Sequence, residues 1–124
     1  MPKKSILLFF AITWTVIIAL FSLVTIGNLG GSIPIPNKDK IIHFIFYFVF
    51  VVLWSSYRKS FDYTKKEGIV ILVIGIGFGI VMELLQGVFT TTRTADIQDA
   101  LANSIGAFIG FLFINKNFRN KRKI

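Results

Sequence analysis

Four long apolar segments constrain the fold of this 124-residue chain more than any other feature. They occupy residues 6–26, 41–57, 68–89 and 97–114. A helix needs about 17 to 25 apolar residues to cross the hydrocarbon core of a bilayer, and each segment reaches that length. The sequence therefore predicts an all-α integral membrane protein, a four-helix bundle formed by a single domain over residues 1–124.

The composition favours a membrane protein over a soluble one. Hydrophobic residues make up 54% of the chain and charged residues 16%, which is more apolar surface than a soluble domain of this size can bury. The net charge of +8 could suggest a nucleic-acid partner. However, the basic residues flank the apolar segments, so we predict membrane lipid and no nucleic acid as a partner. The chain has no cysteine, which excludes disulfides and thiolate metal sites.

The first segment could also be a signal peptide, because Lys3 and Lys4 precede it. It is longer than a usual signal core, and no Ala-x-Ala-like cleavage site follows it. We therefore interpret it as an uncleaved first span.

The distribution of Lys and Arg predicts the orientation of the spans. The N-terminus, the loop after the second span and the C-terminal tail hold all of the 14 basic residues except Lys38, Lys40 and Arg93. Cytoplasmic loops carry such an excess, and an even number of spans places both termini on one side. We predict cytoplasmic termini, with the loops over residues 27–40 and 90–96 facing outward.

With that orientation, polar residues from three spans and two loops gather near the outer surface. Glu83 lies six residues before the end of the third segment, which is about 9 Å of helix. An ionised side chain within a span costs about 2.5 to 3.5 kcal/mol on insertion scales, so Glu83 must be paired, protonated or functional. The predicted cluster consists of Lys40, His43, Glu83, Gln86, Arg93, Asp96, Asp99 and Asn103.

Helical spacing places these residues on common faces. The third span carries Gly75, Gly79, Glu83 and Gln86 on one stripe, and the fourth carries Asp99, Asn103, Gly106 and Gly110. Small residues at this spacing allow close helix approach in lipid, so we expect spans three and four to pack along these stripes. His43 and Tyr47 share a face of the second span by the same rule.

Several of these residues also have purely structural interpretations. Asp96 is best explained as the N-cap of the fourth span, and Asp99 fits either the N3 position of that helix or a functional site. Asn103 could serve only as a hydrogen-bonding residue between helices. A closed salt-bridge network is the structural alternative for the whole cluster, formed by Lys40, Glu83, Arg93 and Asp99.

The ordered set of motifs resembles the VanZ-like family over residues 39–110. Asp39-Lys40, His43 and Tyr47 look like the opening motif of that family. Its second half is similar to the series Glu83, Gln86, Arg93, Asp99, Asn103, Gly106 and Gly110. The resemblance implies a VanZ-like multi-pass protein of the bacterial plasma membrane and cell envelope. The family's namesake is associated with resistance to teicoplanin-type glycopeptide antibiotics. The resemblance implies no particular reaction.

Three functions fit the predicted cluster. The first is an envelope-facing enzyme that binds and processes a headgroup or a lipid-linked envelope component. The second is an accessory protein that binds a headgroup, a glycopeptide or a partner protein without chemistry. The third is a small proton-coupled transporter using Glu83, although no predicted span carries polar residues in its cytoplasmic half.

The sequence assigns candidate roles to the members of the cluster. Glu83, Asp99 and His43 are the catalytic candidates, as general acids or bases. The binding candidates are Lys40, Tyr47, Gln86, Arg93 and Asn103, with Arg93 as an anion clamp. No nucleophile elbow, phosphate loop or His-rich metal motif is present, so no cofactor and no metal are predicted. The carboxylates and the histidine could nevertheless hold a divalent ion.

Overall fold

The structure is a computed structural model that describes residues 3–23, 38–89 and 97–122. Within these ranges it contains four helices and no strand. The helices are α1 (Lys3–Leu23), α2 (Lys38–Lys59), α3 (Lys65–Phe89) and α4 (Ile97–Arg122). Arg93 and Asp96, predicted as an anion clamp and an N-cap, lie outside the described residues.

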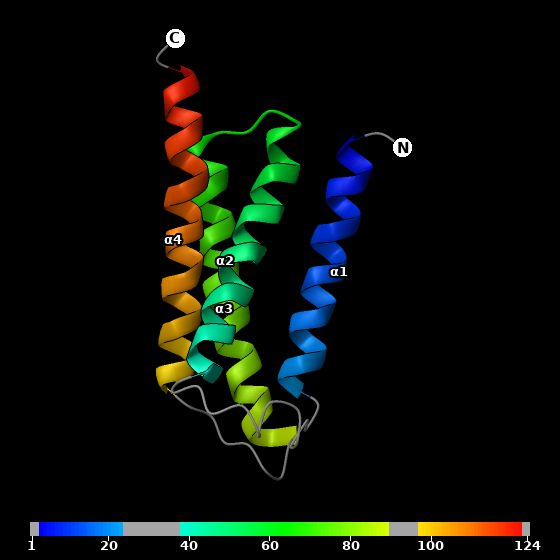
Figure 1. The fold of residues 1–124 in the computed structure, drawn as a ribbon, viewed down its shortest axis with the longest axis vertical. Helices are drawn as coiled ribbons and strands as arrows, with labels where there is room; N and C mark the ends of the chain where they lie inside the picture. The colour runs from blue at the N-terminus through cyan, green and yellow to red at the C-terminus, as the bar shows by residue number, and fades with distance from the viewer. Residues whose placement is uncertain (1–2, 24–37, 90–96, 123–124) are drawn as a thin grey trace.

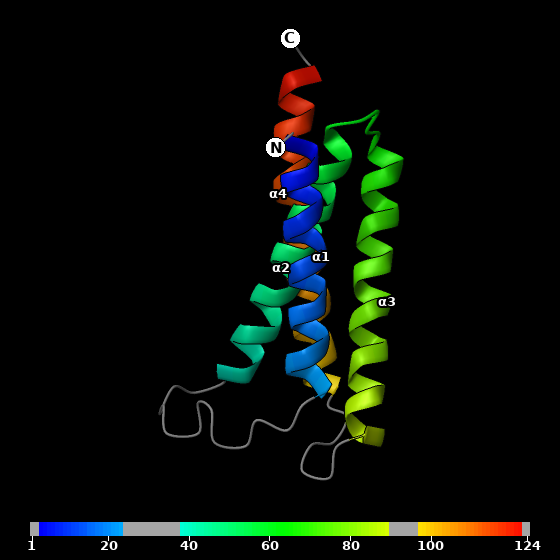
Figure 2. The ribbon, with the colours of Figure 1, turned by 90° about the vertical axis from the view of Figure 1, so that its right-hand side faces the viewer.

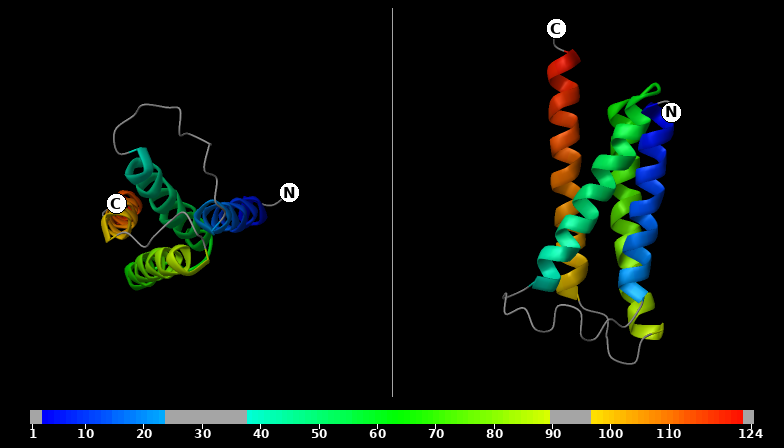
Figure 3. Two further views of the ribbon diagram at one scale, coloured as in Figure 1. Left: turned by 90° about the horizontal axis from the view of Figure 1, so that it is seen from below. Right: turned by 45° about the vertical axis from the view of Figure 1, so that its right-hand side comes forward.

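The four helices run side by side along one long axis (Figure 1). Helix α2 occupies the centre of the bundle, in contact with each of the others, and has its most extensive contact with α4. Helix α1 contacts α2 and α3 but not α4, and the two views from the side and from below place α1 and α4 on opposite sides (Figures 1 and 3).

The bundle has two chemically different ends. We call one the loop end, where α1 and α3 finish and α2 and α4 begin (Figure 2). The other is the terminus end, where α1 begins, α4 ends and α2 is linked to α3 (Figure 1). The expectation that both termini lie at the same end of the bundle is confirmed.

All four helices are long and apolar enough to cross a membrane. They contain 21 to 26 residues, which corresponds to about 31 to 39 Å and exceeds the ~30 Å hydrocarbon core. Large apolar side chains on every helix are about half exposed or more, such as Phe9, Ile41, Val73 and Phe113. Because a soluble protein would bury most of these groups, they form the lipid-facing surface of a four-span membrane bundle.

Several helix boundaries differ from the spans expected from the sequence, and the clearest differences lie at the terminus end. Helix α4 continues to Arg122 rather than ending near residue 114, because a helix can extend beyond the membrane where the apolar run stops. The link between α2 and α3 covers only residues 60–64 rather than 58–67. There Thr64 Oγ1 accepts a hydrogen bond from the Glu67 backbone amide at 3.3 Å, so Thr64 is the N-cap of α3. This cap explains why α3 begins at Lys65.

The glycine stripes do not pair α3 with α4 along their whole length, contrary to the expectation from spacing. A Cβ atom at Gly106 would overlap the carbonyl oxygen of Phe44, and one at Gly110 would lie 2.8 Å from that of Phe48. The glycines of α4 therefore admit the backbone of α2. Of the two stripe glycines on α3, Gly79 faces α4, since a Cβ there would lie 3.1 Å from Asn103, whereas Gly75 faces Phe50 and Val51 of α2.

Helix α1 is attached to α2 by two indole groups. Trp14 Nε1 donates to the carbonyl oxygen of Phe46 at 2.8 Å, and Trp54 Nε1 donates to Thr15 Oγ1 at 3.0 Å. The hydropathy of the helices alternates along the chain: α1 and α3 are markedly more apolar than α2 and α4. The two more polar helices, α2 and α4, are the ones that pack most extensively on each other.

Candidate functional site

The polar cluster lies at the loop end, between α2, α3 and α4. Each helix contributes from the part nearest that end: the first turns of α2 and α4 and the last turns of α3. Its side chains are buried even though they are polar or charged, apart from Lys40, which is partly exposed. We use the name polar cluster for Lys40, His43, Tyr47, Glu83, Gln86, Asp99 and Asn103.

His43 connects the two closest helices of the bundle. Its Nδ1 atom lies 2.8 Å from Asn103 Oδ1 on α4. An amide oxygen only accepts hydrogen bonds, so Nδ1 carries the proton in this contact. The other ring nitrogen, Nε2, faces Asp99 Oδ2 at 3.6 Å. The close approach of α2 and α4 at Gly106 places these groups within reach of one another.

Asp99 is shared between two basic groups. Its Oδ1 atom lies 3.1 Å from Lys40 Nζ, while its Oδ2 atom faces His43. The Lys40 side chain is 26% exposed and that of Asp99 is 11% exposed, so the pair marks the boundary between the buried cluster and the surroundings at the loop end. Asp99 therefore does more than complement the helix dipole at the start of α4.

Glu83 joins the cluster from α3. One ligand atom each from His43, Glu83 and Asp99 can be chosen so that all three lie within 4.8 Å of one another. All three residues are buried. The sequence analysis predicts no metal for lack of a His-rich motif, but leaves open that the carboxylates and the histidine hold a divalent ion. The fold brings them together from three helices.

The buried hydroxyl of Tyr47 and the buried amide nitrogen of Asn103 have no hydrogen-bond partner among the residues that the structure describes. Both residues are only 1% exposed. Tyr47 lies one helical turn from His43, and its hydroxyl is within electrostatic range of the Glu83 carboxylate. An unpaired polar atom in such a place is costly unless a ligand or water completes it.

The structure thus brings together almost every residue that the sequence nominated. His43, Glu83 and Asp99, the catalytic candidates, are neighbours. Of the binding candidates, Lys40 and Asn103 contact this trio, and Tyr47 lies beside it. Gln86 is buried one turn from Glu83 on the same face of α3. Arg93 belongs to the part of the chain outside the described ranges, so its place in the cluster stays a prediction.

Buried polar residues also occur at the terminus end, which the sequence analysis did not expect. Tyr63 donates its hydroxyl proton to Asn115 Oδ1 at 3.2 Å, and Asn115 Nδ2 donates to the carbonyl oxygen of Phe111 at 2.8 Å. Lys59 Nζ donates to the carbonyl oxygen of Ile114 at 2.8 Å. Burial raises the pKa of the Tyr63 phenol, and hydrogen bonding with Ser55 and Asn115 partly offsets that effect.

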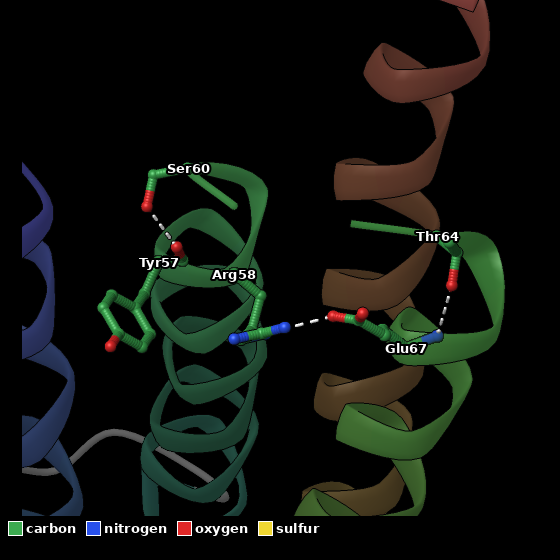
Figure 4. Close-up of polar contacts among 5 residues, drawn as sticks. All are labelled: Tyr57, Arg58, Ser60, Thr64 and Glu67. Atoms are coloured by element: carbon green, nitrogen blue, oxygen red, sulfur yellow. Dashed lines mark hydrogen bonds and ion pairs between the residues drawn. The ribbon is translucent and has the colours of Figure 1, made fainter. Parts of the chain in front are cut away.

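The link between α2 and α3 completes this second polar region (Figure 4). Arg58 Nε donates to Glu67 Oε2 at 3.0 Å, and the Ser60 hydroxyl donates to the carbonyl oxygen of Tyr57. Thr64 caps α3 in the same view. The signal in the sequence was the pattern Thr64-x-x-Glu67, which is typical of a helix start.

Comparison with known proteins now identifies the family. The sequence matches the family described as VanZ/LLP1 over residues 2–118. It is also 35% identical over 83 residues to the uncharacterized protein C11E3.10 of Schizosaccharomyces pombe, an alignment that covers 65% of this chain and 49% of that protein. The chain thus spans about half the length of this curated relative. No solved structure matches it. Because the match extends over nearly all of its residues, the chain belongs to the VanZ/LLP1 family.

Proposed function

We propose that the loop end faces away from the cytoplasm, and that the polar cluster binds and processes the polar head of a lipid or lipid-linked component of the cell envelope. The orientation is supported by the basic residues. The positive-inside rule assigns the terminus end to the cytoplasm. That end holds six basic residues near the helix ends: Lys3, Lys4, Arg58, Lys59, Lys65 and Lys66.

The observation that carries this proposal is the unfinished hydrogen bonding of the cluster. Tyr47 and Asn103 are almost completely buried, and each has a polar atom without a partner in the described parts of the chain. A buried polar atom without a partner costs about 1 to 3 kcal/mol, so a site that served only structure would be expected to pair these atoms. A headgroup rich in hydroxyl and phosphate oxygens can supply the missing partners.

The chemistry of the cluster suits proton transfer to such a headgroup. His43 is held by Asn103 through Nδ1, which leaves Nε2 and the Asp99 carboxylate facing each other as two groups that can take up or release a proton. Glu83 is a second carboxylate within reach of both. Lys40 lies at the partly exposed edge, where an ammonium group can attract an anionic headgroup. In this scheme Arg93 is the anion clamp and Gln86 a hydrogen-bonding group.

Membership of the VanZ/LLP1 family connects the proposal to teicoplanin-type antibiotics, with which the family's namesake is associated. The fission-yeast relative favours a lipid headgroup over the antibiotic itself as the ligand, because lipid headgroups occur in bacterial and yeast membranes alike. We therefore expect any antibiotic tolerance to follow from a change in the envelope rather than from capture of the drug.

A proton-coupled transporter is a weaker candidate, because an apolar layer lies between the two buried polar regions. Along the buried face of α2, Tyr47 is followed one turn later by Val51 and then by Ser55. Val51 packs with Phe50 of α2 and Ala107 of α4, and all three are buried. The described residues therefore offer no continuous polar path across the bundle.

Lipid retention and envelope phenotype test the proposal together. The full chain and its Tyr47→Phe variant are purified in detergent from bacterial membranes, and retained lipids are identified by mass spectrometry. We expect a distinct headgroup class with the wild type, at least about tenfold depleted in Tyr47→Phe, and a matching loss of any teicoplanin tolerance in cells.

Tyr63→Phe is the matched control, since it removes the corresponding hydroxyl at the terminus end and should change neither measurement. Turnover is measured as release of water-soluble product from vesicles of total bacterial lipid, and it separates an enzyme from a binding protein. Equal lipid retention by the wild type and Tyr47→Phe would contradict the proposal.

A further inference from the structure

Three potential metal ligands, each from a different helix, lie close together: His43, Glu83 and Asp99. Their ligand atoms lie within 4.8 Å of one another, and each residue is buried. Bonds to zinc from imidazole nitrogen or carboxylate oxygen measure about 2.0 to 2.2 Å. Two ligands on one tetrahedral ion are therefore separated by about 3.4 Å. The 3.6 Å between His43 Nε2 and Asp99 Oδ2 is close to that spacing and longer than a normal hydrogen bond.

The hydrogen bond from His43 to Asn103 sets the ring up as a ligand. In the tautomer with its proton on Nδ1, the Nε2 atom of His43 presents a lone pair toward the Asp99 carboxylate. A lone pair and a carboxylate oxygen at this distance repel each other unless a proton or a metal ion lies between them. Metal-bound histidines commonly donate their other ring N–H to a carbonyl or carboxylate oxygen, which is what the Asn103 amide provides here.

The unpaired hydroxyl of Tyr47 is an independent sign of a missing group. It is almost fully buried, one turn from His43 and within electrostatic range of Glu83. A water molecule bound to a metal would give this hydroxyl a partner. Lys40 does not compete for the same atom, because it contacts Oδ1 of Asp99 while Oδ2 faces His43.

We propose that His43 Nε2, one carboxylate oxygen of Glu83 and Asp99 Oδ2 bind one divalent metal ion of the zinc class, with Asn103 orienting the histidine. The donor set is one nitrogen and two oxygens, without sulfur, and leaves a fourth position open for water or a ligand. The proposal concerns the resting protein and does not depend on which headgroup the cluster binds.

Zinc content tests the proposal without any assay of activity. The full chain is purified with a tag that contains no histidine, loaded with zinc chloride, dialysed, and analysed by mass spectrometry for metals. The chain has one histidine and no cysteine, so His43 is the sole imidazole ligand available. We expect one equivalent of zinc in the wild type, and an X-ray absorption spectrum with a single imidazole among oxygen scatterers.

Two variants and a matched control complete the test. His43→Ala should weaken zinc binding by at least about tenfold, and Asn103→Ala by about 10- to 100-fold, as loss of a second-shell partner does. Glu67→Gln removes a carboxylate at the terminus end and should change nothing. Absence of bound zinc in the wild type would overturn the metal site and leave headgroup binding to its own test. Zinc retained by His43→Ala, or a spectrum without imidazole, would equally overturn the proposal.

Discussion

The two ends of the bundle use buried polar residues in different ways. At the terminus end, Tyr63, Asn115 and Lys59 all have partners, and their hydrogen bonds join α4 to α2 and to the link before α3. At the loop end, carboxylates face basic groups, while Tyr47 and Asn103 each keep a polar atom that pairs with none of the described residues. Both ends contain a buried tyrosine, so the hydrogen bonding of the two hydroxyl groups can be compared directly.

This difference separates polar residues that hold the fold together from residues kept for a ligand. A satisfied group contributes to stability, and its loss is expected to lower the free energy of unfolding. An unsatisfied buried group lowers stability until a ligand or water pairs with it. Substitutions matched between the two ends therefore test the distinction, because stability and function should respond in opposite ways.

The largest effect is expected from Gly106→Ala. The new Cβ atom would overlap the backbone carbonyl of Phe44, so α4 would have to move away from α2 and the contact between His43 and Asn103 would lengthen. We expect the free energy of unfolding to fall by about 2 kcal/mol or more, measured by denaturant titration in detergent. Gly77→Ala is the control, since nothing lies within 4 Å of a Cβ there. Equal stability of both variants would disprove close α2–α4 packing.

Asp99→Asn should have the next largest effect. The amide keeps the shape of the side chain but removes the charge that pairs with Lys40 and faces His43. We expect a loss of about 2 kcal/mol, less than for a fully buried pair because Lys40 is partly exposed. Headgroup binding should be abolished. If the Asp99→Asn variant retained as much lipid as the wild type, Asp99 would not be part of the binding site.

The paired substitutions Tyr47→Phe and Tyr63→Phe sharpen the comparison most directly. Tyr63→Phe removes a hydrogen bond to Asn115, so the free energy of unfolding should fall by about 1 kcal/mol with lipid retention unchanged. Tyr47→Phe removes a hydroxyl without a protein partner, so stability should stay the same or rise while lipid retention falls. Thermal unfolding of both variants is compared. The same loss of stability in Tyr47→Phe as in Tyr63→Phe would contradict the difference between the two ends.

The smallest effect is expected from Glu67→Gln. Its ion pair with Arg58 is partly exposed at the surface of the terminus end, where such pairs contribute little to stability (Figure 4). We expect no measurable change in unfolding, in lipid retention or in metal content. A clear loss of function in this variant would show that the functional region extends along the whole bundle.

Much of this architecture could be predicted from the sequence, because lipid requires long apolar helices. The spans over 6–26, 41–57, 68–89 and 97–114 correspond to the four observed helices. Four-residue spacing also placed Glu83, Asp99 and Asn103 on faces that turn out to be buried. These properties depend on local periodicity, which the sequence shows directly.

The helix partners could not be predicted in the same way. The glycines of α4 indicate a close approach, but nothing in their spacing says that Gly106 faces α2 rather than α3. The distances between His43, Glu83 and Asp99 depend on that packing, so the sequence allowed a divalent ion at these residues but could not give the ligand geometry. Tyr63 and Asn115 were missed because one lies in a link and the other follows the last apolar run, where periodicity gives no signal.

The alternation of apolar character along the chain has a consequence for biogenesis. A strongly apolar helix, α1 or α3, precedes each of the more polar helices α2 and α4 that carry the histidine and Asp99. Charged residues oppose entry into the bilayer, whereas apolar ones drive it. We expect the nascent chain to enter the membrane as two successive helical hairpins. In each hairpin, the more apolar helix synthesised first would promote insertion of the more polar helix that follows it.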